Sequence, residues 1–235
     1  MLHSLQRWIE SRTNLKGKIE LTGFNILMLF VLGSVVGLFL ETLVSYPVDG
    51  AWKDRSGFVW GPFSPIYGMG IVLFTIVLNE IHDKNPLVMF LVAGVAGGVV
   101  EYFAGLALES WFGIVAWSYV DQPFNFNHTS LFMCVVWGSA GVAWMQLGLE
   151  PAMKLINLIP QKARRPLCVV LTAFLLADCG ATIASWEFWY QRLAGNPVDT
   201  PLEQLFAVWF PDAFMAQKFQ TMSIYPEIAV WRQDA

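Results

Sequence analysis

Five apolar runs, of which the second is short, with charge almost confined to the segments between them, constrain this chain more than any other feature. An α-helix rises about 1.5 Å per residue, so about twenty apolar residues cross the hydrocarbon core of a bilayer. The chain is 56% hydrophobic and only 14% charged, whereas soluble domains carry about 25% charged residues. We therefore predict an all-α integral membrane helical bundle of about five transmembrane helices. The expected spans are 23–44, 65–78 or 65–81, 87–108, 130–149 and 167–189.

The two ends of the chain differ from the membrane domain expected at 21–190. Residues 1–20 interleave four basic residues with apolar ones, which fits an amphipathic helix on the cytoplasmic surface and equally fits a plain helix start. Residues 191–235 are polar enough for an extramembrane or interfacial tail. Within it, Thr200 to Glu203 form a capping box that opens a helix. The apolar residues expected to rest on the membrane surface from this helix are Leu205, Phe206, Trp209 and Phe210.

Lysine and arginine placement predicts the orientation in the membrane. With five spans, nine basic residues fall on the side of the N-terminus and five on the other. This favours a multi-pass protein of a cell membrane, expected to be a bacterial inner membrane, with the N-terminus cytoplasmic and the C-terminus outside. The tryptophans expected to form an interfacial belt are Trp52, Trp60, Trp111, Trp117 and Trp189.

The loop between the first two spans has an unusual composition, because residues 54–70 carry an ion pair, four glycines and two prolines. Ser64 and Pro65 give an N-cap and a proline at the first helical position. Arg55 has two interpretations. It is either a structural partner of Glu41 or Glu109, or an anion clamp that acts with the helix N-terminus capped by Ser64.

A hexapeptide repeat favours a parallel duplication of a two-helix unit. Residues 37–42 (Gly-Leu-Phe-Leu-Glu-Thr) return as residues 105–110 (Gly-Leu-Ala-Leu-Glu-Ser), 68 positions later. Chance matching of common residues is the alternative, but a glutamate is rare in a span. The duplication predicts that Glu41 and Glu109 face each other across a central cavity, with the fifth span added to a four-helix core. The pairs Gly33/Gly37 and Gly94/Gly98 indicate close helix packing.

Ionisable residues in a bilayer are costly and mark functional sites. Glu101 lies well inside the third span, and Asp178 lies near the middle of the fifth with Thr182 and Ser185 on the same face. Paired carboxylates in such a place could do acid–base work, bind a cation or relay protons, and the residues alone do not separate these.

Several chemistries have no motif in this chain. No Walker A, HExxH, GxSxG or dinucleotide-binding sequence occurs, so we expect no cofactor and no catalytic residue of those types. The three cysteines lie in apolar runs and the three histidines are scattered, so no metal site is expected. His128 is expected as an interfacial polar group at the outer mouth. A net charge of −4 does not favour nucleic-acid binding.

The motifs resemble those of one family over about residues 24–190. Residues 54–70 are similar to the pattern N-R-G-F…G-P-x-x-P-I-Y-G-x-G of the CmpB-like putative ABC-transporter type IV membrane protein family. The sequence departs from the family pattern in two places. Where the family has W-D-Y-S, this chain has Trp117-Ser118-Tyr119-Val120. Where the family has N-x-x-G-R-I, residues 125–130 of this chain read Asn-Phe-Asn-His-Thr-Ser. Further matches are Glu41-Thr42, Glu101-Tyr102, Gly105, Glu109, Asn125, Trp137-Gly138, and Asp178 with Ser185.

The resemblance implies a membrane transporter component that works with a separate ATPase subunit. Our leading hypothesis is a permease-like protein with an outward-facing polar cavity and an unknown substrate. The alternatives are a membrane-embedded enzyme or lipid-headgroup-binding protein, and a structural membrane scaffold. The partners expected are the lipid bilayer and that ATPase, with a homo-oligomer left open. The predicted substrate-binding residues are Glu41, Arg55, Tyr67, Glu101, Glu109, Asn125, Trp137 and Asp178.

Overall fold

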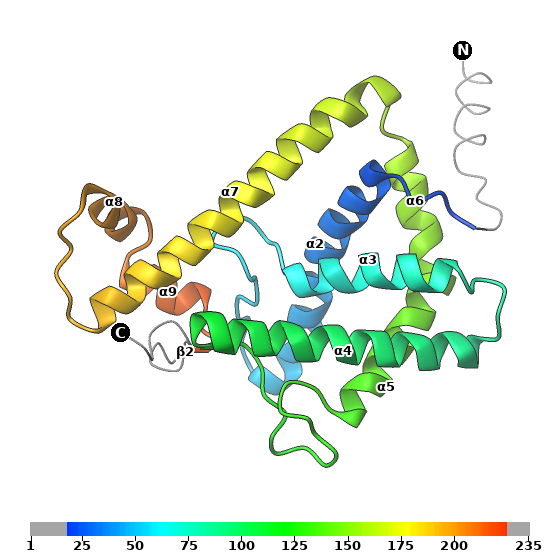
Figure 1. Cartoon of the computed structure of the whole chain (residues 1–235), viewed down its shortest axis with the longest axis horizontal. Helices are drawn as coiled ribbons and strands as arrows, with labels where there is room; N and C mark the ends of the chain where they lie inside the picture. Colours follow the sequence, from blue (N-terminus) through cyan, green and yellow to red (C-terminus); the bar gives the residue numbers. More distant parts are fainter. Residues whose placement is uncertain (1–17, 225–235) are drawn as a thin grey trace.

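The computed structural model describes residues 18–224, which form helices joined by loops and one short pair of strands (Figure 1). The predicted N-terminal helix falls almost wholly outside the described residues. The elements are α2 (Gly23–Asp49), α3 (Pro65–Asn79), α4 (Pro86–Phe112), β1 (Ile114–Val115), α5 (Leu131–Ala143), η1 (Trp144–Gly148), α6 (Leu149–Asn157), α7 (Gln161–Leu193), α8 (Pro201–Trp209), α9 (Asp212–Lys218) and β2 (Ser223–Ile224).

Four helical runs of the described chain are long and apolar enough to cross a membrane. They are Gly23–Pro47, Pro86–Phe112, Leu131–Asn157 and Gln161–Leu193. Only 11% to 33% of the most apolar window of each is buried inside the protein, so most of their apolar surface is available to lipid. The expected second span is a shorter apolar helix, α3, so the described residues do not supply five long spans.

α2 and the run from α5 to α6 extend further than expected, for identifiable reasons. α2 continues to Asp49 and stops at Gly50, whose positive φ of 67° lets its N–H reach the Tyr46 carbonyl. The expected fourth span, which begins at α5, continues to Asn157 through the π-helical turn η1. The indole of Trp144, the first residue of that turn, donates a 2.9 Å hydrogen bond to the hydroxyl of Thr75 in α3.

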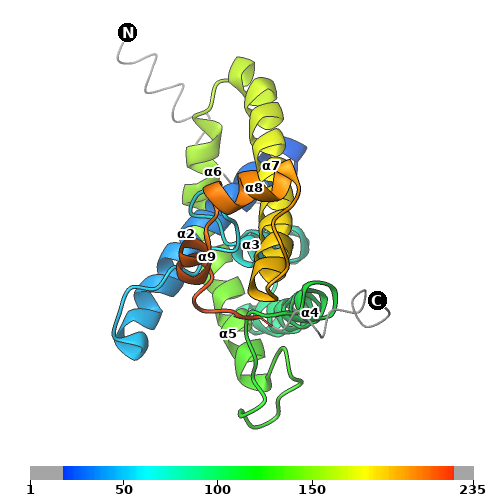
Figure 2. The ribbon, with the colours of Figure 1, turned by 90° about the vertical axis from the view of Figure 1, so that its left-hand side faces the viewer.

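Small residues bring two pairs of helices close together, α2 with α3 and α4 with α5. A Cβ on Gly33 of α2 would lie 2.9 Å from Cβ of Ile71 in α3. A Cβ on Gly94 of α4 would lie 2.7 Å from the carbonyl oxygen of Cys134 in α5. Glycine is therefore needed for both approaches, as the spacing of these glycines predicts. α3 and α4 lie side by side and cross α2 and the α5–α6 run steeply (Figures 1 and 2).

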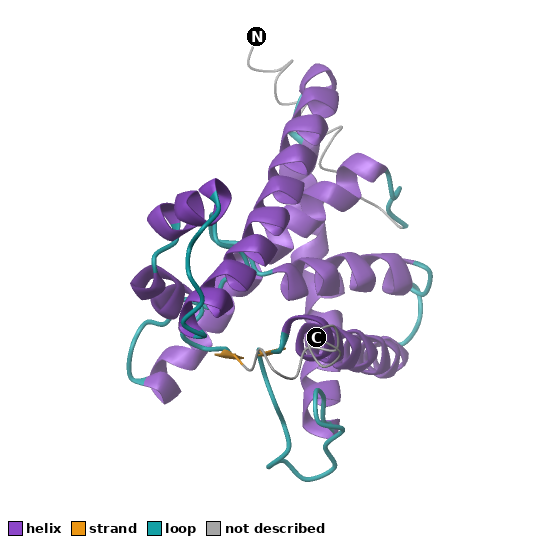
Figure 3. Cartoon of the chain, turned by 60° about the vertical axis from the view of Figure 1, so that its left-hand side comes forward, coloured by secondary structure: helices purple, strands orange, loops and turns teal. Residues whose placement is uncertain are grey.

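The C-terminal residues fold back onto the end of α7. The capping box at Thr200 and Glu203 is present, which confirms that prediction. β2 pairs with β1 in the only strand pair of the described chain, and everything around it is helix or loop (Figure 3).

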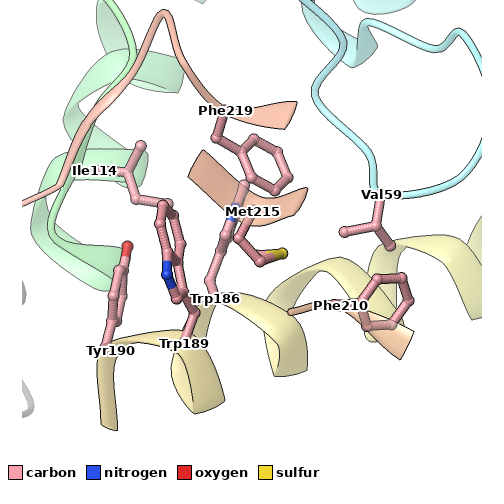
Figure 4. Packing of buried hydrophobic residues seen from close by; sticks show 8 residues of the cluster. All are labelled: Val59, Ile114, Trp186, Trp189, Tyr190, Phe210, Met215 and Phe219. Atoms are coloured by element: carbon pink, nitrogen blue, oxygen red, sulfur yellow. The ribbon is translucent and has the colours of Figure 1, made fainter. Parts of the chain in front are cut away.

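One tail residue and one belt residue are buried, against the expectation from sequence. Phe210 and Trp189 are 3% and 6% exposed, because both join an apolar core that the tail closes over α7 (Figure 4). The other described members of that core are Val59, Ile114, Trp186, Tyr190, Met215 and Phe219. Leu205 and Trp209 of α8 remain exposed, as a surface-lying helix requires.

Candidate functional site

Arg55 is held between two carboxylates at the end of α2. Its Nη1 donates to Glu41 over 3.0 Å, and its Nη2 donates to Asp49 over 2.6 Å. Lys53 adds a second contact to Asp49 at 3.2 Å. Hydrogen bonds from Arg55 and then Lys53 lower the pKa of the Asp49 carboxyl below its usual value. The geometry therefore agrees with the interpretation of Arg55 as a partner of Glu41, because its two terminal nitrogens are already engaged.

The loop that carries Arg55 runs down the side of α2 before α3 begins. The N–H of Ser64, the N-cap residue of α3, donates to the carbonyl of Ser34 over 3.2 Å. Residues 34 to 49 of α2 therefore extend past the start of α3 by about 22 Å along the axis of α2. Ser64 occupies the N-cap position with Pro65 at the first helical position, as expected, but its side chain makes no capping hydrogen bond. The helix N-terminus is thus not capped in the way the anion-clamp interpretation assumed.

The loop between α4 and α5 repeats this arrangement. Glu101 is 4% exposed. Its carboxylate accepts one hydrogen bond of 2.8 Å from the hydroxyl of Thr129, just before α5, and one of 2.9 Å from the phenol of Tyr119. Residues 101 to 112 of α4 extend past this point by about 16 Å along the axis of α4. Both loops therefore come from the ends of long helices and bring polar side chains down among the helices.

These two loops meet in one group of side chains, which we name the central polar cluster. The phenol of Tyr67 in α3 interacts with Glu41, and its ring centroid lies 6.3 Å from that of Trp137. Trp137 is 9% exposed and lies beside Glu101, with its buried Nε1 outside hydrogen-bond geometry. The central polar cluster consists of Glu41, Asp49, Arg55, Tyr67, Glu101, Tyr119, Thr129 and Trp137.

Tyr119 connects the two halves of the central polar cluster. Burial first, and the neighbouring Glu101 carboxylate second, raise the pKa of the Tyr119 phenol well above its usual value. Glu41 also raises this pKa, so it lies within electrostatic range of Tyr119. The phenol therefore remains a neutral hydrogen-bond donor at every physiological pH. With three carboxyl groups and one guanidinium, the cluster has formal acidic character.

The two copies of the hexapeptide make equivalent contacts. Gly37 leaves room for the ring of Tyr67, and Tyr67 interacts with Glu41 one turn further on. Gly105 leaves room for the ring of His128, whose Nε2 lies 2.9 Å from an oxygen of Glu109 one turn further on. Each repeated glutamate thus has its own ring partner. The sequence predicted that Glu41 and Glu109 face each other across one cavity. The structure instead gives each of them a different partner, Tyr67 and His128.

Three predicted residues lie outside the central polar cluster. Glu109 pairs with His128, which is 3% exposed and so is a buried partner rather than an interfacial group. Asn125 donates to the carbonyls of Val120 and Gln122 within its own loop. Asp178 is fully buried in α7.

Asp178 holds the first loop against α7. Its Oδ1 accepts from the N–H of Trp60 over 3.0 Å, and the hydroxyl of Thr182 accepts from the N–H of Val59 over 2.9 Å. Asp178, Thr182 and Ser185 are all buried, so they do share a face. Lys218 of α9 ties the same loop to the tail by a 3.1 Å contact with Asp54.

Sequence reasoning missed Asp49, Tyr119 and Thr129 as members of the site. Asp49 had a weak signal, since it immediately precedes the glycine that ends α2. Tyr119 stands in a segment that resembles a family motif, but its contact with Glu101, 18 positions away, depends on how the loop folds back.

Two of the grooves on the described part of the chain are lined by residues outside the central polar cluster. One, of about 290 Å³, is lined almost wholly by apolar side chains of α2 with Trp52 and Pro62. The other, of about 430 Å³, lies between the ends of α4 and α7. Among the described residues, no group of three or more histidine, cysteine, aspartate or glutamate side chains could hold a metal ion.

Comparison with known proteins gives one family. The model of the family described as "Putative ABC-transporter type IV" matches residues 28–183, about two thirds of the chain and a range that contains every predicted site residue. Neither the comparison with curated proteins nor the comparison with solved structures gave a significant match.

Proposed function

The chain belongs to the putative ABC-transporter type IV family, and from this premise we propose that it is the permease-like, membrane-spanning subunit of a transporter. The four long apolar helices fit a multi-pass membrane protein. The central polar cluster is its solute-recognition element. A separate ATPase subunit supplies the energy, since the chain carries no Walker A sequence.

The observation that carries this proposal is the descent of two loops to one acidic cluster. Irregular backbone at membrane depth is tolerated only where protein buries it or where it lines a water-filled cavity. Broken or short helices that start at such a point are a feature of solute sites in transporters. α3 and the loop before it together make a fifth crossing, which preserves a cytoplasmic N-terminus and an external C-terminus.

The charge of the cluster favours a positively charged solute or a proton. Arg55 is engaged by two carboxylates, and Glu101 has no basic partner among its contacts in the described chain. The N–H of Trp137 lies beside Glu101 but outside hydrogen-bond geometry, so it gives one additional polar contact for a solute. An anionic solute would meet three carboxyl groups and only one guanidinium.

Charge-selective labelling tests the proposal without knowledge of the substrate. Thr129→Cys is made in a chain whose Cys134, Cys168 and Cys179 are replaced, and proteoliposomes are treated from outside with cationic and anionic methanethiosulfonate reagents. We expect the cationic reagent to react faster, and Glu101→Gln to reduce its advantage. Ser139→Cys, on the exposed surface of α5, is the lipid-facing control and should react with neither. The reagents are then also added inside the vesicles. If Thr129→Cys reacts with neither reagent on either side, the central polar cluster only holds the helices together and the proposal is wrong.

Transport itself is tested in the same vesicles. Entry of protons and of labelled methylammonium is compared with entry of labelled phosphate, with and without the Glu101→Gln change. Movement of the cation probes that disappears in Glu101→Gln supports the proposal. Turnover of a lipid by the purified chain alone would instead favour the alternative of a membrane enzyme.

A further inference from the structure

One side of α8 is apolar and exposed. The side chains on this side are 41% to 76% exposed. They are Leu202, Leu205, Val208 and Trp209, which we name the α8 apolar face. Residues separated by three or four positions lie on the same side of a helix, so these four form one continuous surface. The α8 apolar face is therefore available to a partner outside the chain.

The opposite side of α8 fixes the direction in which the α8 apolar face points. The ring of Phe206 lies 5.1 Å from that of Phe188 in α7 and 5.5 Å from that of Phe210. Arg192 of α7 donates to the carbonyl of Phe210 over 2.9 Å and to the carboxylate of Asp212 over 2.6 Å. Phe206 and Phe210 therefore pack inward, although the sequence placed both at the membrane surface. α8 would have to break these contacts to bury its apolar face against the chain.

α8 lies where the apolar run of α7 stops. After Asp178, the next charged residues of α7 are Glu187 and Arg192, so the edge of the hydrocarbon core falls within the C-terminal turns of α7. Phe188, against which α8 packs, belongs to the same turns. Figures 1 and 2 show that α8 lies across α7 and not along it. A helix that lies across the end of a membrane-spanning helix follows the plane of the bilayer surface.

The charge around α8 shows what kind of attraction it can use. Residues 194–217 contain no lysine or arginine, and their acidic residues are Asp199, Glu203 and Asp212. Interfacial helices that bind anionic lipids carry lysine and arginine on their polar side. Without such residues, α8 can be attracted to a membrane only through its apolar side chains.

We propose that α8 is an interfacial anchor whose apolar face enters the boundary between the headgroups and acyl chains of the surrounding bilayer. Lipid is favoured over a second protein because α8 packs on α7, and only 11% of the most apolar window of α7 is buried. Both helices thus present apolar surface to the same surroundings. Trp209 adds a ring of the type enriched at this depth. The proposal does not depend on the central polar cluster or on the transported solute.

Nitroxide labels on the full-length chain in phosphatidylcholine nanodiscs test the proposal. The three native cysteines are replaced, and one new cysteine is labelled at a time. Leu205→Cys places the label on the α8 apolar face, and Gln204→Cys places it on the exposed neighbour about 100° around the helix. We expect the label at Leu205 to be relaxed more by oxygen, which concentrates in lipid, than by an uncharged water-soluble nickel chelate. The label at Gln204 should show the reverse.

Two results would overturn the proposal. Greater relaxation by the nickel chelate at both positions would place the whole of α8 in water. Weak relaxation of the Leu205 label by both reagents would show that protein covers the α8 apolar face, and dipolar broadening between labels would identify that protein as a second copy. An unfolding midpoint equal to that of the unlabelled parent verifies that each labelled chain is folded.

Variants of the α8 apolar face connect the depth to named residues. Leu202→Asp together with Trp209→Asp should reduce the oxygen preference at Leu205→Cys to the value measured at Gln204→Cys. Gln204→Asp adds a charge on the other side of α8, so it is the matched control and should leave the preference unchanged. An unchanged preference in the double variant, in folded protein, contradicts the assignment of these residues to the anchor.

Lipid composition tests whether the attraction is apolar. Replacement of half the phosphatidylcholine by phosphatidylglycerol should leave the ratio of oxygen to nickel relaxation at Leu205→Cys within about twofold, because α8 has no basic residue to attract anionic headgroups. A larger rise in this ratio would show that charge holds α8 at the membrane and would overturn the apolar mechanism.

Discussion

The phenol of Tyr119 donates a 2.9 Å hydrogen bond to the carboxylate of Glu101, which is 4% exposed between α4 and α5. This bond joins a loop at the end of α4 to a point about 16 Å lower on the same helix. The loop is thereby packed among the helices.

Removing that hydroxyl tests how firmly the loop is held. Tyr119→Phe should lower the free energy of unfolding by about 1 to 3 kcal/mol, because hydrogen bonds to buried carboxylates exceed the ordinary net value. The measurement is the thermal or denaturant unfolding midpoint in detergent. Tyr46→Phe, at a phenol 41% exposed, is the control and should change little. Equal stability of both variants would show that the Tyr119 bond contributes nothing.

A double-mutant cycle on Arg55 and Glu41 measures their ion pair. The two side chains are only 21% and 27% exposed, so we expect a coupling energy of about 1 kcal/mol, above the value for solvated pairs. The variants are Arg55→Ala, Glu41→Gln and their combination, each assayed by unfolding.

The pair of Lys18 and Glu80 is the matched control for this cycle. Its N···O distance is 2.6 Å, but the side chains are 50% and 60% exposed. The same cycle there should give a coupling below about 0.5 kcal/mol. Coupling at Arg55 and Glu41 no larger than at Lys18 and Glu80 would argue that burial does not strengthen the first pair.

Acid should loosen the contact between the tail and the first loop. Burial by itself raises the pKa of Asp54, but hydrogen bonds from Ser56 and Lys218 outweigh it and lower this pKa below its usual value near 3.8. A carboxyl with a lowered folded-state pKa stabilises the fold above its unfolded-state pKa, and this stabilisation is lost as the pH falls through the folded-state pKa. We therefore expect stability to fall below about pH 4.

Lys218→Ala should move the acid unfolding transition to higher pH, since Asp54 then keeps the cost of burial and loses a charged donor. Unfolding at a series of pH values from 3 to 6 measures the shift. Asp83→Asn, which changes an exposed loop carboxylate, should leave the transition in place. An unshifted transition in Lys218→Ala contradicts the role given to this contact.

Glycine at position 37 should be required for the position of Tyr67. A Cβ there would overlap Cβ of Tyr67, so Gly37→Ala should destabilise the protein by about 1 to 3 kcal/mol through overpacking. It should also separate Tyr67 from Glu41, which weakens the central polar cluster.

Gly180 in the middle of α7 provides the opposite case. Apart from its chain neighbours and the backbone of α7 itself, no atom of the described residues lies within 4 Å of a Cβ built there. Gly180→Ala should therefore be neutral or stabilise the helix by up to about 1 kcal/mol, because alanine loses less backbone entropy. Equal effects of the two substitutions on stability would show that the contact with Tyr67 does not set the cost at Gly37.

The sequence by itself determined the class of the protein, a helical membrane protein, since each membrane-spanning helix is a continuous run of apolar residues that can be recognised without knowledge of the rest of the fold. It also predicted local signals such as the capping box at Thr200 and the glycines that pack α2 on α3 and α4 on α5. It left Arg55 open between a partner of Glu41 or Glu109 and an anion clamp, and the structure pairs Arg55 with Glu41.

Only the tertiary structure decided which carboxylates share a site. Glu101 accepts hydrogen bonds from Tyr119 and Thr129, whereas Glu109 pairs with His128. These contacts form only because the loop between α4 and α5 folds back among the helices. Such contacts connect positions far apart in the chain, and no local periodicity encodes them. The groove between the ends of α4 and α7 could likewise not be predicted, since it forms only when Phe112 at the end of α4 meets Trp186 near the end of α7.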